Sequence, residues 1–176
     1  MRAVKASVPA ARAAKPVDLE TRLTDDHHQA LKLWLRLLSC TNLVEAEIRT
    51  RLRAEFGMTL PRFDLMAQLE RNAGGLKMNE LSRRLMVSGG NVTGLTDQLE
   101  KEALVARADD PGDRRAYTVK LTPAGRALFA RMAAVHEEWV IELFSGLTSS
   151  DKAQVHRQLA KLKLHIAGVT AAREER

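Results

Sequence analysis

The sequence predicts a mainly helical fold with one small β-hairpin, and three observations support this class. Apolar residues recur at helical spacing through most of the chain after residue 25. Two short runs of strand character, "LVARA" and "AYTVKLT", are joined by the turn-forming stretch "DDPGDRR". A short helix, a turn and a capped helix come directly before this hairpin. That order is typical of a winged helix-turn-helix with additional helices at both ends.

Composition and charge restrict the class of protein. The chain has 176 residues, 45% hydrophobic and 28% charged, as expected for one globular domain with extensions. No apolar run approaches the roughly 18 residues that a membrane helix needs, so we expect no membrane partner. Residues 1–24 are basic and lack the apolar core of a secretion signal, which predicts a mobile tail. The single cysteine, Cys40, excludes an internal disulfide and favours the reducing cytoplasm.

Residues 25–57 are expected to form a first dimerisation helix, because they carry two apolar stripes. One stripe contains Leu31, Trp34, Leu35 and Leu38, and the other contains Leu33, Leu37, Cys40 and Val44. At about 100° per residue, these stripes lie on nearly opposite sides of the helix. A helix that is apolar on two sides is buried on two sides, and in so short a chain we expect a second subunit to provide the additional cover. The pattern therefore predicts a homodimer.

The helix-turn-helix is expected within residues 58–122. Pro61, shortly after Thr59, marks the start of a helix through "PRFDLMAQLERN", which ends at "AGG". A short helix, "KMNELSRRLM", follows. Ser88 is then a suitable N-cap for the stretch "GGNVTGLTDQLEKE", which forms the second helix of the motif.

Residues 123–176 are expected to form two further dimerisation helices. Thr122 caps the first, with Pro123 at its first position, and the apolar stripe of this helix continues to Gly146. The stretch "TSSD" resembles a capping box, with Asp151 in place of the usual glutamate. It opens a last helix with apolar residues at helical spacing, which are Val155, Leu159, Leu162 and Ile166.

A capped second helix and an arginine-bearing hairpin together favour double-stranded DNA as a partner. Such a helix fits the major groove, and arginines on a hairpin reach the backbone or the minor groove. Charge alone is a weak indication: the net charge is +6, but residues 77–120 hold eight Lys or Arg against seven Asp or Glu. The alternative is a helical interaction protein, an anti-regulator that does not bind DNA and whose hairpin is only a connector.

Residues 80–129 resemble the core of the MarR family of transcription regulators. Members are similar in a helix of the type S-x-x-x-V-T-x-L-x-D-x-L-E, a D-R-R hairpin tip and an L-T-x-x-G helix start. The matching residues here are Ser88, Val92, Thr93, Leu95, Asp97, Leu99, Glu100, Asp113, Arg114, Arg115, Leu121, Thr122 and Gly125. Three positions depart from the pattern: Ala103 replaces a usual glycine, Gln98 a common arginine, and Gly94 a larger side chain.

The resemblance extends over roughly residues 25–168 in element order. It implies a ligand-responsive transcription regulator with no enzymatic activity and no cofactor. It further implies a repressor that a small molecule releases from its operator. A two-fold dimer then predicts a pseudo-palindromic operator, with half-sites about one helical turn apart.

Glycines occupy two of the most outward positions of the second helix, Gly90 and Gly94. Because glycine allows a close approach of the backbone, we expect this helix to lie close to the wall of the groove. The helix residues expected at the DNA are Ser88, Gly90, Asn91, Thr93, Gly94 and Gln98, of which Asn91, Thr93 and Gln98 contact bases. Phosphate contacts and DNA shape supply the rest. The alternative is that the glycines only reflect a tolerant, exposed helix.

At the hairpin tip, Asp113 and Arg115 are two residues apart, close enough for the carboxylate to orient the guanidinium. The resemblance implies that Asp113 positions Arg115 and that this arginine enters the minor groove. It assigns Arg114 to a phosphate contact. The alternative is a charged turn exposed to solvent.

The resemblance also implies an inducer site between the dimerisation helices and the DNA-binding lobe, where small aromatic acids bind in similar dimers. The expected ligand-binding residues are Trp34, Leu38, Asn42, Arg49, Arg53, Phe63 and Met66. Along the first helix they are apolar at one end and basic at the other, which suits an aromatic body with an anionic group. The stretches "LLSCTNLVEAEIRTRL" and "LPRFDLMAQLE" are similar to MarR-type repressors of hydroxycinnamate (p-coumarate) catabolism, which respond to a coenzyme A thioester such as p-coumaroyl-CoA. Alternatively, Trp34 is core and residues 45–53 form an ion-pair ladder on a solvated helix.

Two other chemistries have weaker support. Cys40 is a candidate oxidant sensor, since the family includes thiol-based members, but its place in an apolar stripe predicts a buried, inert thiol. The five histidines lack a metal-ligand spacing, and His136 with Glu137 and Glu138 is more typical of a solvated face than of a metal site. We therefore expect no metal site.

Overall fold

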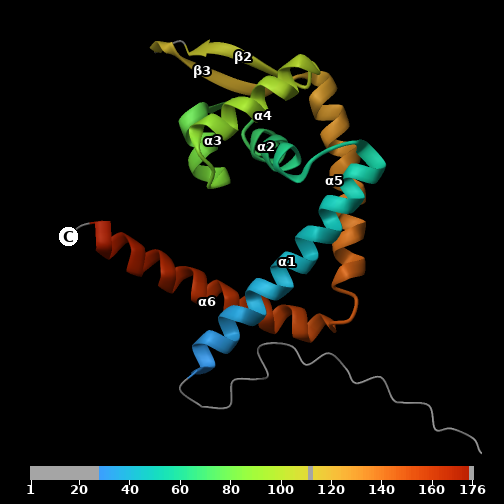
Figure 1. The fold of residues 1–176 in the computed structure, drawn as a ribbon, viewed down its shortest axis with the longest axis vertical. Helices are drawn as coiled ribbons and strands as arrows, with labels where there is room; N and C mark the ends of the chain where they lie inside the picture. The colour runs from blue at the N-terminus through green and yellow to red at the C-terminus, as the bar shows by residue number, and fades with distance from the viewer. Residues whose placement is uncertain (1–27, 111–112, 175–176) are drawn as a thin grey trace, which may run out of the picture. The chain divides into compact units, whose positions relative to one another are not determined.

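The structure is a computed structural model that describes residues 28–110 and 113–174, without the side chains of residues 109, 110, 113–116 and 174. The predicted tail, residues 1–24, lies outside the described residues. The elements are α1 (Gln29–Phe56), α2 (Leu60–Glu70), β1 (Leu76–Lys77), α3 (Met78–Leu85), α4 (Gly89–Lys101), β2 (Val105–Asp110), β3 (Asp113–Leu121), α5 (Pro123–Leu143) and α6 (Ser149–Glu174). The fold is mainly helical, with a small antiparallel wing and helices at both ends, as predicted (Figure 1).

The chain divides into two compact units, Met1–Glu45 and Ala46–Arg176, so the boundary falls inside α1. The four-part division predicted from the sequence stays a prediction. In the first unit, the described residues form the beginning of α1, and its apolar side chains are exposed or half-buried. Trp34 is 57% exposed, so the alternative that it belongs to the core is wrong for the single chain. Cys40 is exposed as well, and the expectation of a buried thiol is wrong for the single chain.

The hydrophobic core of the second unit joins α2, α3 and α4 to the sheet. Its fully buried apolar side chains include Leu65, Met66, Leu69, Leu81, Val92, Leu99, Val105 and Val119. On α4, Val92, Leu95, Thr96 and Leu99 lie on the face opposite the glycines, and all are buried or half-buried. The Thr96 hydroxyl donates to the Val92 carbonyl at 2.8 Å, which satisfies its polar group inside the core. The opposite face of α4 is thereby left toward solvent.

The three-stranded sheet has the order β1-β3-β2, and both pairings are antiparallel. Leu76 pairs with Val119, and Val105 pairs with Leu121. β1 was not predicted, because two residues are too short to show an alternating pattern. The expected long turn over 109–115 is also wrong: β2 continues to Asp110 and β3 begins at Asp113, with a register shift at Asp109. Strand pairing therefore extends into a stretch whose composition favours turns, with an irregularity between Asp109 and Asp110.

The junction between the wing and α5 explains the L-T-x-x-G pattern. The Thr122 hydroxyl accepts a hydrogen bond from the Gly125 amide at 3.0 Å and donates to the Ala103 carbonyl at 2.7 Å. A Cβ at Gly125 would lie 1.9 Å from the Leu104 carbonyl oxygen, so only glycine allows this close approach. The predicted cap at Thr122 is confirmed, and it fixes the start of α5 to the end of α4.

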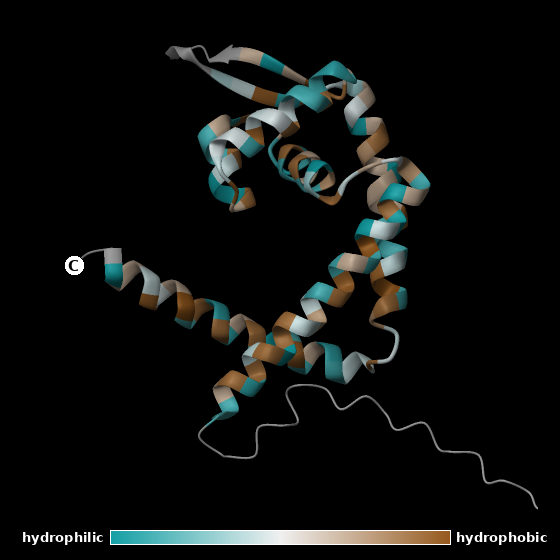
Figure 2. Cartoon of the chain, viewed as in Figure 1, coloured by the Kyte–Doolittle hydropathy of each residue, from teal (hydrophilic) through white to brown (hydrophobic). Residues whose placement is uncertain are grey.

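The last helix is capped as predicted. The Thr148 hydroxyl accepts from the Asp151 amide at 3.2 Å, and the Asp151 carboxylate accepts from the Thr148 amide at 3.0 Å. Hydrogen bonds from Thr148, first from its hydroxyl, lower the pKa of the Asp151 carboxyl below its usual value. None of the described side chains of α6 is buried in the single chain, although hydrophobic positions recur along it (Figure 2).

Ion pairs join several helices of the second unit. Arg51, at the end of α1, donates to Glu142 on α5 at 2.6 Å, and Arg126 on α5 donates to Glu70 on α2 at 3.1 Å. Within the described parts of the chain, no helix has the length and apolar character needed to span a membrane.

Candidate nucleic-acid interface

The turn before α4 places the start of this helix. Met86 has a φ of 53°, in the left-handed region, and its amide donates to the Arg83 carbonyl at 3.3 Å. The Ser82 hydroxyl donates to the Val87 carbonyl at 2.6 Å. Ser88 follows with an extended backbone, and its hydroxyl accepts from the Asn91 amide at 3.4 Å. The predicted N-cap at Ser88 is confirmed.

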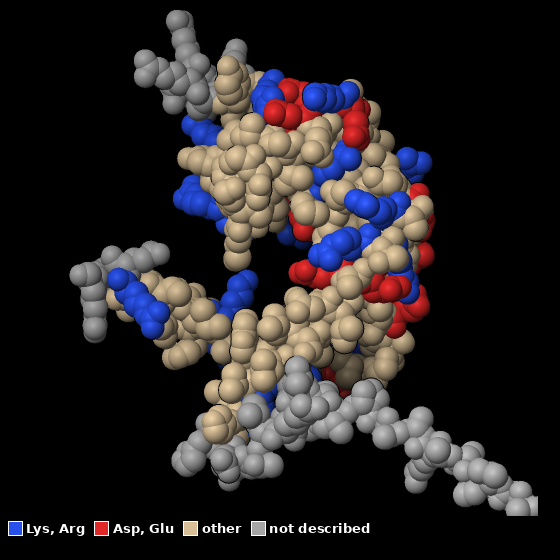
Figure 3. Space-filling view, in the orientation of Figure 1, with Lys and Arg blue, Asp and Glu red and all other residues tan. Residues whose placement is uncertain are grey.

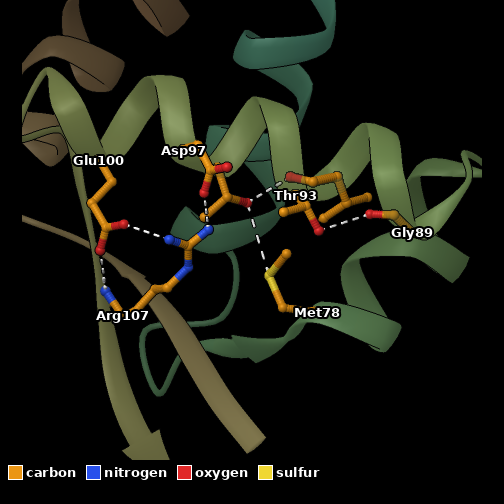
Figure 4. Close-up of polar contacts among 8 residues, drawn as sticks. Met78, Gly89, Thr93, Asp97, Glu100 and Arg107 are labelled. Carbon is orange, nitrogen blue, oxygen red and sulfur yellow. Dashed lines mark hydrogen bonds and ion pairs between the residues drawn. The ribbon is translucent and has the colours of Figure 1, made fainter.

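The exposed face of α4 is polar but carries little charge. Gly90 and Gly94 lie on it, and a Cβ at either position would meet nothing within 4 Å. Asn91, Thr93 and Gln98 are exposed beside them. The Thr93 hydroxyl donates to the Gly89 carbonyl at 3.0 Å, so it offers a ligand its methyl group and its lone pairs rather than its proton (Figure 4).

Two hollows flank this exposed face. One has a volume of about 340 Å³ and is lined by Pro61, Val87, Gly90, Asn91, Gly94, Leu95 and Gln98. The other has a volume of about 560 Å³ and is lined by Met78, Asn79, Ser82, Arg83, Gly89 and Thr93. The first borders the start of α2, and the second lies between α3 and the start of α4. The two hollows leave α4 as a ridge between them.

Two exposed arginines at the end of α3 were not among the predicted site residues. Arg83 lines the larger hollow beside the first turn of α4, and Arg84 follows it. Lys and Arg side chains gather over α3 in this face of the lobe (Figure 3). In helix-turn-helix proteins the first helix crosses the DNA backbone, so an adjacent pair of arginines in "SRRL" was the sequence signal for phosphate contacts.

A second set of residues that the sequence did not reveal ties α4 to the wing. Arg107 on β2 donates to Glu100 at 2.6 Å and also to Asp97, and its amide donates to Glu100 at 3.3 Å (Figure 4). The hydrogen bond with Asp97, followed by the charges of both carboxylates, raises the pKa of the Arg107 guanidinium above its usual value. This contact compensates the negative charges of two carboxylates that would otherwise repel a phosphate backbone. It also holds the base of the wing against α4.

The wing tip stays a prediction. The backbone of Asp113, Arg114 and Arg115 lies in β3, but their side chains are outside the described part of the structure. The expected orientation of Arg115 by Asp113 is therefore untested.

Another ion pair holds α2 against the end of α4. The Arg62 guanidinium is almost completely buried and donates through Nη2 to Glu102, which follows α4. This contact positions the start of α2, and with it Pro61, beside the smaller hollow.

The predicted ligand-binding residues lie in different environments. Trp34, Leu38 and Asn42 are exposed on the part of α1 in the first unit, and Arg49 and Arg53 are exposed on the part in the second unit. Met66 is completely buried in the lobe core, so it can reach a ligand only after the core opens. Their common role in ligand binding stays a prediction.

Phe63 belongs to an aromatic cluster between α2 and α5. Its ring centroid lies 5.4 Å from that of Phe129 and 5.0 Å from that of His136. Burial lowers the pKa of His136 below 6.5, so the ring favours the neutral form. Glu137 and Glu138 are exposed, as expected for a solvated face, but His136 is half-buried, because α2 covers this side of α5 and helical periodicity does not show it.

These elements define a winged helix-turn-helix protein with long flanking helices. Residues 56–116 match the MarR family. A solved MarR family transcriptional regulator from Silicibacter pomeroyi is 33% identical, covers 81% of this chain and 99% of its own, and superimposes with a TM-score of 0.70. The repressor MdtR of Bacillus subtilis is 31% identical over 106 residues, which are 60% of this chain and 68% of MdtR. The chain belongs to the MarR family, which is a family of transcription regulators and not of enzymes.

Two further proteins are similar to this chain, one in sequence and one in fold. The transcriptional activatory protein BadR of Rhodopseudomonas palustris is 34% identical over 106 residues, which cover 59% of this chain and 60% of BadR. A mutant of MarR from E. coli, solved in complex with operator DNA, has a TM-score of 0.68 at 24% identity and covers 79% of this chain and 99% of its own. At this identity the second likeness concerns the fold alone. The first shows that curated relatives include activators as well as repressors.

Proposed function

We propose that this protein binds double-stranded operator DNA as a homodimer and regulates transcription in the cytoplasm in response to a small molecule. The observation that carries the proposal is the exposed face of α4, which presents Asn91 and Gln98 and has its two carboxylates compensated by Arg107. A capped helix with such a face suits the major groove.

The contacts on either side of α4 divide into two kinds. Arg83 and Arg84 on α3 are suited to phosphates, which determine affinity and its dependence on salt. At the wing, Arg115 inserts into the minor groove with Asp113 holding it, and Arg114 contacts a phosphate. Ser88, Gly90, Thr93 and Gly94 let the start of α4 approach the groove wall.

The test is the affinity for promoter DNA next to the protein's own gene, measured by fluorescence anisotropy over a series of salt concentrations. Arg83→Ala and Arg84→Ala should each weaken binding and reduce the slope of log affinity against log salt by about 1.8, because the homodimer loses two phosphate contacts at about 0.9 each. Arg131→Ala, at an exposed position on α5, is the matched control and should leave the slope unchanged. If no sequence-dependent binding is detected, the protein is instead a helical interaction protein.

We propose repression as the direction of control, with release by a small aromatic acid or its coenzyme A thioester, such as p-coumaroyl-CoA. The exposed Arg49 and Arg53 suit a phosphate-bearing ligand, and the aromatic cluster of Phe63, Phe129 and His136 in the same unit supports an aromatic body. A reporter gene behind the operator distinguishes repression from activation.

The inducer is tested by titrating the DNA complex with p-coumarate and, separately, with p-coumaroyl-CoA. Only the thioester should release the DNA, and the double variant Arg49→Ala with Arg53→Ala should blunt its effect. Release requires different affinities for the two conformations, about 5.5 kcal/mol for a shift from 1:99 to 99:1. If neither compound acts at about millimolar concentration, corresponding to roughly 4 kcal/mol of binding free energy, the proposed inducer is wrong.

The exposure of Cys40 favours a second candidate signal, oxidation of its thiol. Peroxide should then release the DNA from the native protein and fail to release it from Cys40→Ser. Equal release from both proteins would exclude this signal.

A further inference from the structure

The smaller hollow beside α4 combines two kinds of lining. Its apolar walls come from Pro61, Val87 and Leu95, and its polar edge comes from the amides of Asn91 and Gln98. Gly90 and Gly94, one turn apart, open it toward solvent because neither has a side chain. An apolar recess thus lies directly beside two side chains that each both donate and accept hydrogen bonds.

The polar groups of α4 are better suited to adenine than to guanine or cytosine. A side-chain amide matches N6 and N7 of adenine, whereas guanine is read by arginine or lysine. From Gly89 to Glu100 the helix has no basic residue, and Lys101 comes only at its end. Carboxylates can accept a hydrogen bond from cytosine, but Asp97 and Glu100 are already bound to Arg107.

The apolar recess fits the other base of the same pair. Thymine is the base that presents a methyl group in the major groove, and this methyl is recognised by apolar contact. Because Gly90 and Gly94 have no side chains, the helix backbone can approach the bases, and a methyl group can enter the recess between α4 and Val87.

We propose that α4 selects A·T base pairs, with Asn91 and Gln98 bonding to adenine and the recess at Gly90 and Gly94 receiving the methyl group of the paired thymine. The proposal rests on the proposed DNA binding and specifies which bases determine it. The base pairs under α4 in each half-site are then A·T, and exchange of one for G·C weakens binding by about 5- to 150-fold.

The experiment begins with selection of binding sites from random double-stranded DNA by the full chain at fixed salt. In the recovered site, each thymine is replaced in turn by deoxyuridine, which lacks only the methyl group. At one or more half-site positions the affinity should fall about fourfold, the effect of exposing one methyl-sized group. Replacement of the paired adenine by 7-deazaadenine, which lacks the N7 acceptor, should weaken binding about fivefold.

Variants of the protein connect each effect to its residue. Gly94→Ala adds a methyl group at the opening of the recess, where it holds the helix backbone away from the thymine methyl, and should abolish the difference between thymine and deoxyuridine, whereas Gly89→Ala should retain it. Gly89 is a matched control because it lies in the same helix, is equally open, and lines the other hollow. Asn91→Ala and Gln98→Ala should remove the sensitivity to 7-deazaadenine at separate positions.

The outcomes separate this inference from the proposed function. If selection recovers no DNA, both are wrong. If it recovers a site whose half-sites depend on G·C pairs, or one in which every deoxyuridine is tolerated, the protein binds DNA and the A·T inference is wrong. A loss of discrimination in Gly89→Ala equal to that in Gly94→Ala also overturns it, because the effect would then come from the helix and not from the recess.

Discussion

Ala103 has a φ of 57° in the turn between α4 and β2. In this left-handed region the Cβ of any residue but glycine is crowded, at a cost of about 1–2 kcal/mol. The family pattern usually has glycine at this position. The backbone at Ala103 is therefore strained. Surrounding hydrogen bonds hold it in this conformation, among them the bond from its amide to the Glu100 carbonyl at 2.9 Å.

The substitution Ala103→Gly should raise the free energy of unfolding by about 0.5–1 kcal/mol, since relief of strain exceeds the added flexibility of the unfolded chain. Urea unfolding followed by circular dichroism measures the change. Ala130→Gly, at an exposed position inside α5, is the control and should lower stability by about 1 kcal/mol. A loss of stability in both variants would contradict the strain at Ala103.

Prediction from the sequence succeeded for residues whose role is local. Ser88 and Thr122 form the expected caps because the cap, the helix start and the hydrogen-bonded amide all lie within a few positions. Arg107 was missed because its partner Asp97 is ten positions away, on a helix whose angle to the strand the sequence does not give. Burial of Cys40 was wrong for a related reason: periodicity identifies a shared face but not what covers it.

At the scale of elements, the tie between β2 and α4 has a direct consequence for DNA binding. Arg107→Ala would leave Asp97 and Glu100 as uncompensated negative charges on α4, the helix proposed to contact the DNA. We expect the affinity for operator DNA to fall at least about tenfold, roughly 1.4 kcal/mol, with the larger loss at low salt. Anisotropy titrations at several salt concentrations measure this.

Neutralising the two acids tests the cause of that loss. In the background of Arg107→Ala, the added changes Asp97→Asn and Glu100→Gln should restore part of the affinity, because they remove the repulsion. Arg126→Ala breaks an ion pair with Glu70 away from α4 and should have little effect on affinity. Failure of the acid substitutions to restore any binding would show that Arg107 acts through the position of the wing alone.

The contact between α2 and α5 predicts a dependence of stability on pH. Burial lowers the pKa of His136 in the folded chain below 6.5, so the unfolded chain takes up a proton first as the pH falls. Above about pH 7 both states are neutral and the histidine contributes no pH dependence. Stability should therefore decrease from near pH 6.5 downward, until the folded chain is also protonated.

Urea unfolding at pH 7.5 and pH 5.5, roughly one unit on either side of the unperturbed histidine pKa, measures this effect. His136→Phe keeps an aromatic ring next to Phe63 and should lose less stability at the lower pH than the native chain does. His156→Gln, at an exposed position on α6, serves as the control and should keep the native dependence. An unchanged dependence in His136→Phe would assign the effect to other groups.

Helices were predicted more reliably than strands. The ends of α1 and α2 and the starts of α4, α5 and α6 follow from caps, prolines and apolar spacing in the sequence. β1 and the extension of the hairpin depend on pairing with β3. For β1, this partner lies more than 30 residues further along the chain. Strand formation there depends on pairing across the sheet and not on local composition.

At the scale of the whole molecule, the exposed apolar residues of α6 predict self-association. Val155, Leu159, Leu164, Ile166 and Val169 are all at least 40% exposed in the single chain. Apolar side chains repeated along one helix mark an interaction surface when no described part of the chain buries them. Light scattering should give about twice the mass of 19.6 kDa for one chain.

Leu159→Glu should convert the dimer to a monomer, because a carboxylate in an apolar interface is strongly unfavourable. Lys161→Glu, exposed on the same helix, changes the charge without removing an apolar side chain and should remain dimeric. A monomeric native protein at about micromolar concentration, equivalent to less than roughly 8 kcal/mol of association energy, would contradict the assembly.

Because none of the described side chains of α6 is buried in the single chain, we expect the order of this helix to depend on the protein concentration. A helix of 26 residues gains most of its stability from packing, and in the proposed dimer another chain would supply that packing. Dilution should therefore lower the melting temperature of the protein, whereas a single-chain core would melt at a temperature independent of concentration. In a cell, the concentration of folded regulator able to bind DNA would then rise more steeply than the number of chains synthesised. The rate at which the protein is synthesised would therefore also influence the regulation.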